Sequence, residues 1–255
     1  MNKPIYVMSF GIKTSAVMFL LTVLLLAAFP AAAHNVAAKD AEFLKQSQGA
    51  HIIPFIYLGA KHMVTGYDHL LFLFGVIFFL YRLKDVAVYV TCFAVGHSIT
   101  LLTGVLTGMH LNPFIVDAII GLSVVYKAFD NLDGFRTLFG FQPNTKVAVL
   151  AFGLVHGFGL ATKLQDLHLS ANGLIGNMLS FNVGVEIGQL LALSVILLAM
   201  TWWRSTADFN RHAVTANVIV MTLGFLLMGY QIAGYYSDRQ TAKTTVANVF
   251  PGGAR

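Results

Sequence analysis

Long apolar stretches alternate with short polar connections along the whole chain. About 20 apolar residues in a helix cross the hydrocarbon core of a bilayer. Stretches of this kind recur six times after residue 50, at approximately 54–81, 86–106, 112–130, 146–163, 173–203 and 213–236. The pattern predicts an all-α, polytopic membrane helix bundle with six transmembrane helices, preceded by a cleaved signal peptide.

The segment 1–33 has the pattern of a secretory signal. Lys3 and Lys13 precede a short apolar run, Pro30 ends it, and three alanines at 31–33 supply a cleavage site. The alternative is an uncleaved first membrane helix. The predicted organisation is therefore a signal peptide (1–33), a six-helix domain (34–236) that begins with a short periplasmic segment (34–53), and a periplasmic polar tail (237–255).

Composition supports a membrane protein and excludes several other classes. Hydrophobic residues make up 57% of the chain and charged residues 11%, whereas a soluble domain carries about 25% charged residues. The net charge of +5 is scattered over short loops without a basic cluster, so we expect the lipid bilayer and no nucleic acid as a partner. Cys92 is the one cysteine, which excludes an intrachain disulfide and a CxxC site.

The distribution of basic residues predicts the orientation. With the mature N-terminus outside, the connections 82–85, 131–145 and 204–212 lie inside, and the outside connections 107–111 and 164–172 contain no basic residue. The basic residues in or near the inside connections are Arg82, Lys84, Lys127, Arg136, Lys146, Arg204 and Arg211. The positive-inside rule then predicts a multi-pass protein of the bacterial inner membrane with periplasmic N- and C-termini.

Ionisable residues near the middle of four spans are the strongest functional signal. A charge at this depth costs at least ~2.5 kcal/mol and normally faces a bundle interior or a pathway. These residues are Asp68, His69, His97, His156 and Glu186. Asp117 lies deeper than a helix end but nearer the outside, and we expect it to line a pathway.

The first span concentrates metal-binding side chains in the pattern His62-x5-Asp68-His69. On an unbroken helix the two histidines share a face; alternatively, Gly66 breaks the helix and frees backbone carbonyls for the site. Histidine with carboxylate suits nickel, cobalt or zinc. The alternative is a buried Asp–His pair that only holds helices together.

Glycines four residues apart bracket two further ionisable residues. They are Gly153 and Gly157 around His156, and Gly184 and Gly188 around Glu186. Such frames permit close helix packing, so we expect both ionisable residues in tight crossings rather than facing lipid. His97 follows Gly96 in the second span and is either a ligand or an interhelical hydrogen-bonding group.

A polar stripe on the fifth span combines Asn182, Glu186 and Gln189 at helical spacing. We interpret it as the lining of a pathway, with a structural polar seam as the alternative. Lys163, near the end of the fourth span, is expected to snorkel; alternatively, it is a counter-ion for a nearby polar residue. Cleavage after residue 33 would expose His34, whose amine and imidazole could chelate a metal; alternatively, it merely follows the cleavage site.

A faint internal repeat relates the two halves of the chain. The segment 93–99 aligns with 181–187 with four identities, and the same offset places Asp68 opposite His156. Halves of three spans each are necessarily inverted, as in secondary transporters with sites at the midplane.

Four blocks in order carry a resemblance to a known family. They are His62-x5-Asp68-His69-Leu-Leu-Phe, Gly96-His97-Ser98-Ile-Thr-Leu, Gly153-Leu-Val-His156-Gly157-Phe-Gly and Phe181-Asn182-Val-Gly-Val-Glu186-Ile-Gly-Gln189. From about residue 50 to 235 the chain resembles the HupE/UreJ family of exported bacterial membrane proteins. The resemblance implies a nickel or cobalt permease that serves hydrogenase or urease maturation. The metal ligands it implies are His62, Asp68, His69, His97, His156 and Glu186.

The sequence therefore predicts a transporter, not an enzyme, with Ni²⁺ or Co²⁺ as the transported ligand and no prosthetic group. An intramembrane zinc hydrolase is an alternative, although no His-Glu-x-x-His motif is present. A second alternative is an accessory protein that delivers nickel or copper to a partner through His34.

Overall fold

The computed structural model describes residues 42, 49–166 and 170–249, with side chains up to residue 240. All of them belong to one unit, Ala33–Arg255. The predicted signal peptide and His34 lie outside the described residues. In the described part the regular structure is entirely helical.

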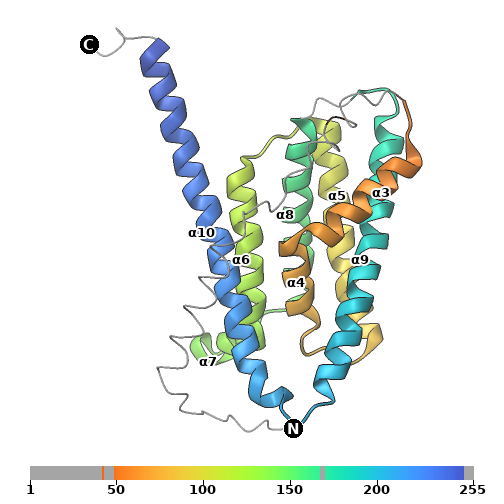
Figure 1. The fold of residues 1–255 in the computed structure, drawn as a ribbon, viewed down its shortest axis with the longest axis vertical. Helices are drawn as coiled ribbons and strands as arrows, with labels where there is room; N and C mark the ends of the chain where they lie inside the picture. Colours follow the sequence, from red (N-terminus) through yellow and green to blue (C-terminus); the bar gives the residue numbers. More distant parts are fainter. Residues whose placement is uncertain (1–41, 43–48, 167–169, 250–255) are drawn as a thin grey trace. The chain divides into compact units, whose positions relative to one another are not determined.

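Consecutive long helices run in alternating directions (Figure 1). The helices are α3 (Ile52–Thr65), α4 (Tyr67–Ile77), α5 (Leu83–Thr107), α6 (Pro113–Asn131), α7 (Gly134–Phe139), α8 (Thr145–Gln165), α9 (Leu174–Arg204) and α10 (Phe209–Val249). The predicted all-α bundle is confirmed. The short helix α7 lies in the predicted inside connection 131–145, and α10 extends through part of the predicted tail.

Four helices are long and apolar enough to cross a membrane: α5, α8, α9 and the part of α10 up to Gln240. Helix α6 is long enough but contains three charged residues, Asp117, Lys127 and Asp130. Helices α3 and α4 are shorter apolar helices. The chain is a membrane protein, and the count of six crossings stays a prediction.

Gly66 interrupts the first span. Its backbone is extended, with φ −75° and ψ 101°, and its N–H donates to the carbonyl of His62 at the end of α3. A helix end leaves its last carbonyls and the next helix's first N–H groups without partners in the helix. Of the two alternatives for this span, the broken helix is the one observed, and the break lies between the two histidines.

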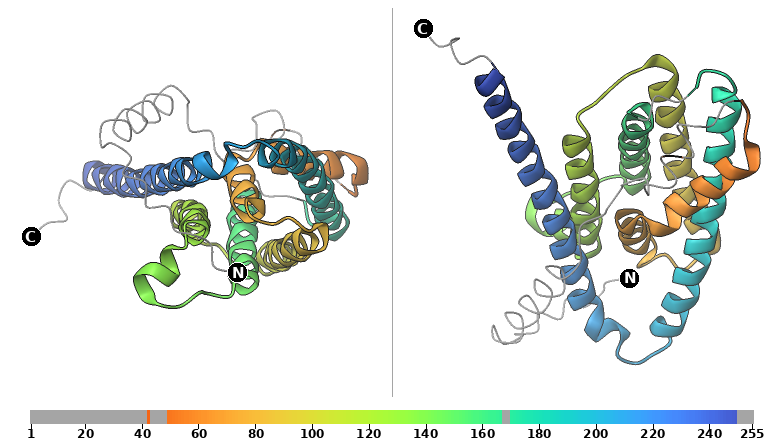
Figure 2. Two further views of the ribbon diagram at one scale, coloured as in Figure 1. Left: turned by 90° about the horizontal axis from the view of Figure 1, so that it is seen from below. Right: turned by 45° about the horizontal axis from the view of Figure 1, so that its top comes forward.

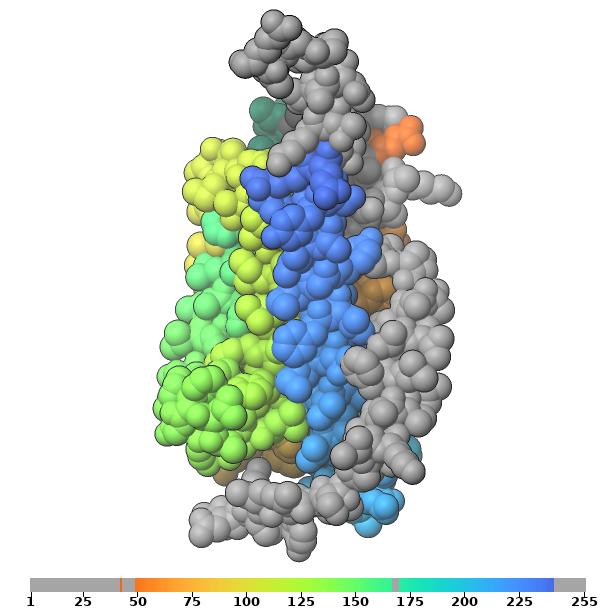
Figure 3. Space-filling view, turned by 90° about the vertical axis from the view of Figure 1, so that its left-hand side faces the viewer, coloured from red at the N-terminus to blue at the C-terminus, as the bar shows by residue number. Residues whose placement is uncertain are grey.

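Three helix pairs form the closest packing: α5 with α8, α3 with α9, and α6 with α10. In a space-filling view α10 lies lengthwise along α6 (Figure 3). Helix α4 contacts α6, α9 and α10, and lies among the longer helices when the bundle is seen from below (Figure 2).

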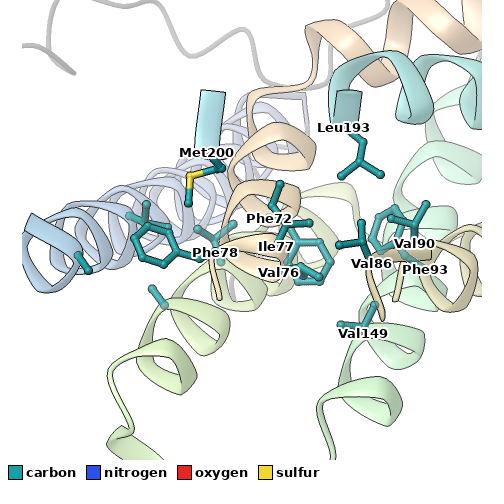
Figure 4. Packing of buried hydrophobic residues seen from close by; sticks show 14 of the residues in the cluster. Phe72, Val76, Ile77, Phe78, Val86, Val90, Phe93, Val149, Leu193 and Met200 are labelled. Carbon is teal, nitrogen blue, oxygen red and sulfur yellow. The ribbon is translucent and has the colours of Figure 1, made fainter. Parts of the chain in front are cut away.

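Two apolar clusters fill the interior. The first, called the lower cluster here, joins side chains of α4, α5, α6, α8, α9 and α10, including Phe72, Val90 and Phe93 (Figure 4). The second, called the upper cluster, includes Phe55 and Phe181. The lower cluster reaches the end of α4 and the start of α10, on the predicted cytoplasmic side.

Arg204 fixes the lower end of α4. Its guanidinium donates to the carbonyls of Ile77, Phe78 and Leu80, which follow the last turn of that helix or belong to it. Hydrogen bonds to a charged group contribute more than neutral ones. Arg204 therefore links α4 to the end of α9.

We expect Arg204→Leu to lower the free energy of unfolding by about 2 kcal/mol, because it leaves buried carbonyls without their donor. Thermal unfolding of the purified protein in detergent measures the loss. Arg211→Leu, an exposed arginine in α10, is the matched control and should change stability little. Equal effects of the two substitutions would contradict the capping role.

Candidate metal centre

Three histidines converge where α3 breaks and α4 begins. His62 lies in the last turn of α3, His69 in the first turn of α4 and His97 in the middle of α5. One ring nitrogen from each lies within 4.8 Å of the others. His69 and His97 are 1% and 0% exposed, whereas His62 is half-buried. Among the described residues, this is the one group of three histidine, cysteine or acidic side chains close enough to hold a metal.

His156 of α8 adds a fourth imidazole beside the three. Its ring centroid lies 5.1 Å from that of His69, and the side chain is buried. Its Nδ1 lies 2.7 Å from the carbonyl oxygen of Phe152. A carbonyl only accepts, so Nδ1 carries the proton and Nε2 carries the lone pair that a metal requires.

Asp68 orients His69. Its Oδ1 lies 3.0 Å from Nδ1 of His69, and both side chains are buried. A carboxylate on one ring nitrogen of a histidine fixes the ring and directs the other nitrogen toward a metal. The alternative of a purely structural Asp–His pair accounts for these two residues alone and leaves three further imidazoles unexplained.

Aromatic rings from both apolar clusters lie against the histidines. Phe93 of the lower cluster lies 4.9 Å from His156 between ring centroids, and Phe181 of the upper cluster lies 6.0 Å from His62. Both phenylalanines are buried. The low polarity of this shell strengthens any interaction of the histidines with a charge.

The amides of α9 face the same region. Gln189 Nε2 lies 3.5 Å from the carbonyl of Val90 in α5, and because α9 and α5 run in opposite directions this contact places Asn182 level with His97. Asn182 is 6% exposed and Gln189 1%. Within the described chain, both amide atoms of Asn182 and Oε1 of Gln189 have no hydrogen-bond partner, so these atoms are available to water or an ion.

Residues 38–239 match the family model described as HupE / UreJ protein. The chain belongs to the HupE/UreJ family. It has no match among curated proteins or solved structures. The HupE/UreJ match spans all the helices that supply the histidines, so the predicted family resemblance is confirmed.

Glu186 of this HupE/UreJ chain lies apart from the histidines. Its side chain is exposed on α9, so the expectation that the glycine frame would turn it inward is wrong. Gly184 and Gly188 pack against α3, and a residue two positions from each lies about 200° around the helix. His156 follows Gly153 by three residues, so it lies on the same side of α8 as the glycines that pack against α5. The position of the ionisable residue within each glycine frame therefore distinguishes the buried His156 from the exposed Glu186.

Asp117 also lies outside the cluster of histidines. Its Oδ2 accepts from Lys163 Nζ at 2.8 Å, and the two side chains are 7% and 16% exposed. Of the two alternatives for Lys163, the counter-ion is therefore the one observed, because a carboxylate of α6 lies within its reach. Like the metal roles of Glu186 and Asp68, the pathway role of Asp117 stays a prediction.

Sequence reasoning missed the two phenylalanines. Phe93 and Phe181 occupy the same position in the two aligned repeat segments, which was the available signal. Phenylalanine is common in membrane helices, so its presence alone did not distinguish them from lipid-facing or core residues.

Proposed function

We propose that this protein is a membrane permease for a divalent transition metal, Ni²⁺ or Co²⁺, which it binds at the histidines described above. The observation that carries the proposal is the group of three histidine nitrogens within 4.8 Å of one another, two of them on buried side chains, at a break in an apolar helix. Neutral imidazole suits nickel, cobalt and zinc.

The position of the site supports transport rather than a structural metal. Polar groups in the bilayer interior are expensive and usually mark a pathway. A helix broken at its centre also offers carbonyl oxygens to a passing cation, as in secondary transporters. A transported ion must bind well enough to enter and weakly enough to leave. A site whose ligands come from four helices, α3, α4, α5 and α8, permits both, because a shift of one helix removes a ligand.

The proposal also includes the location of the protein in the cell. We place the protein in the bacterial inner membrane with periplasmic termini, on the basis of its basic connections. The imported metal would supply hydrogenase or urease maturation, as the HupE/UreJ resemblance implies.

Uptake into proteoliposomes tests the proposal. Ni²⁺, Co²⁺, Zn²⁺ and copper are offered separately to vesicles with and without the purified protein. Saturable uptake of Ni²⁺ or Co²⁺ supports a permease. Tight binding without flux would instead favour an accessory protein, and product formation that needs bound zinc would favour a hydrolase.

Asn182→Leu separates a functional amide from a packing one. Both amide atoms of Asn182 have no hydrogen-bond partner in the described chain, so an apolar side chain of similar size should leave stability unchanged or raised. Uptake should fall about tenfold if the amide holds a water or the ion beside the histidines. Unchanged uptake would contradict the lining role.

Asn177→Leu is the matched control on the same helix. Asn177 lies near the start of α9. Its side chain accepts a hydrogen bond from the N–H of His51 and donates one to the carbonyl of Gly49. This substitution should therefore lower the melting temperature and leave the apparent affinity for metal unchanged. The two asparagines are thus expected to show opposite patterns.

A further inference from the structure

The closest contacts of the bundle repeat themselves in the two halves of the chain. Gly96 of α5 lies against the carbonyl of Leu150 in α8, and Gly184 of α9 lies in the same way against the carbonyl of Ile56 in α3. The aligned segments pair Gly96 with Gly184. The contact of α5 with α8 is therefore reproduced by the contact of α9 with α3.

Two further contacts obey the same correspondence. Gly153 meets the carbonyl of Phe93, and Gly59 meets the carbonyl of Phe181. Thr100 donates to the carbonyl of Leu154 at 2.7 Å. At its counterpart, Gly188, a β-carbon would lie 2.6 Å from the carbonyl of Ala60.

The third helices of the two halves, α6 and α10, pack against each other and correspond to each other in the same way. A β-carbon on Gly121 would lie 2.7 Å from the backbone nitrogen of Met228, and one on Gly224 would lie 2.9 Å from that of Val125. Gly121 and Gly224 are thus equivalent, as are Val125 and Met228. Since the two helices are antiparallel, the axis that relates them lies in the plane of the membrane.

This correspondence corrects the residue opposite His156. The contacts align α8 with α3 so that His156 matches His62 rather than Asp68. Equivalent residues of α3 and α8 are six residues further apart in the sequence than equivalent residues of α5 and α9. The ring pair of Phe93 with His156 is accordingly equivalent to the ring pair of Phe181 with His62. The two halves contribute the same aromatic–histidine unit to the centre.

The two phenylalanines lie beside the histidines at different depths. The contact of Gln189 with Val90 places Phe181 level with Ser98, so Phe93 and Phe181 are separated by about 7 Å along the helix axis. Phe93 is nearer the start of α5 and belongs to the lower cluster, and Phe181 is nearer the start of α9 and belongs to the upper cluster.

We propose that Phe93 and Phe181 are a symmetry-related pair of gates, each of which closes the metal path on one side of the histidines. The inference rests on the proposed function, because it assigns the gates of that same site. Phe93 closes the path toward the predicted cytoplasmic side, and Phe181 closes it toward the predicted periplasmic side. With both rings in place, His69 and His97 are closed from both sides.

A single cysteine reports access to the site. The background is Cys92→Ser with His69→Cys, since His69 contacts the other three imidazoles. A membrane-impermeant thiol reagent is added to right-side-out or inside-out membrane vesicles. The reporter should react slowly from both sides. Adding Phe93→Ala should raise the labelling rate at least tenfold from the cytoplasmic side only, and Phe181→Ala from the periplasmic side only.

The controls separate a gate from a general loss of packing. Phe55→Ala removes another buried ring of the upper cluster and should leave labelling slow from both sides. Phe93→Leu and Phe181→Leu remove less volume and should show the same sidedness if either alanine variant fails to fold. Labelling from the wrong side, from both sides equally, or without any increase would overturn the proposal. Because labelling needs no metal, it tests the gates even if the proposed metal transport fails.

Discussion

Replacing His69 with alanine is expected to reduce saturable metal uptake by at least about a hundredfold, because loss of a ligand should exceed the 10–100-fold effect of losing its outer-shell support. His69 lies at the centre of the site, with its ring centroid 5.1 Å from those of His62 and His156 and 6.3 Å from that of His97. Initial rates of Ni²⁺ and Co²⁺ uptake into proteoliposomes measure the effect, together with metal binding by the purified variant.

Two further variants make this result specific. His110→Ala removes an exposed histidine that pairs with Asp166, and should leave uptake unchanged. Asp68→Asn keeps the size of the side chain but removes the carboxylate that orients His69, and should reduce affinity about tenfold. Normal uptake by the His69 variant would exclude this group of histidines as the transport site.

Gly184→Ala is expected to prevent stable assembly of α9 with α3. A β-carbon at Gly184 would overlap the backbone of Ile56, and backbone yields less readily than a side chain. Overpacking of this kind costs about 1–3 kcal/mol and occasionally more, which is a large fraction of the stability of a typical domain. The yield of monodisperse protein in detergent and its melting temperature measure the loss.

Gly229→Ala is the matched substitution in α10. In the described part of the chain, no atom outside the adjoining backbone of α10 lies within 4 Å of a β-carbon at Gly229, and alanine favours a helix over glycine by about 1 kcal/mol. This variant should therefore be as stable as the parent protein or more so. If Gly184→Ala were equally well tolerated, the close crossing of α3 and α9 would be contradicted.

Several elements of the site could be predicted from residue types alone. Histidine and aspartate are expensive within a bilayer, so His69, His97 and His156 stood out in apolar segments without any knowledge of the fold. Gly66 was a candidate break because glycine weakens a helix and interrupts this span. The glycine frames indicated close crossings because only glycine allows backbones to approach so closely.

The rotation of each helix was less accessible. Glu186 and Asn182 are four residues apart, a spacing that predicts one shared helix face, yet Asn182 is buried and Glu186 exposed. The position of Lys163 near the end of a span predicts snorkelling, but Asp117 on another helix pairs with it. The burial and the partner of a polar side chain depend on which neighbouring helix packs against it.

The sequence by itself determined the helices, the membrane class, the family resemblance and the identity of the candidate ligands. Hydrophobic length and the cost of polar groups in lipid act along the chain, so they can be read residue by residue. Only the tertiary structure decided that His62, His69 and His97 meet, that Glu186 points away, and that His156 corresponds to His62. Those results follow from the packing of helix pairs, in which distant backbone contacts such as that of Gly153 with Phe93 set the rotation and depth of every side chain.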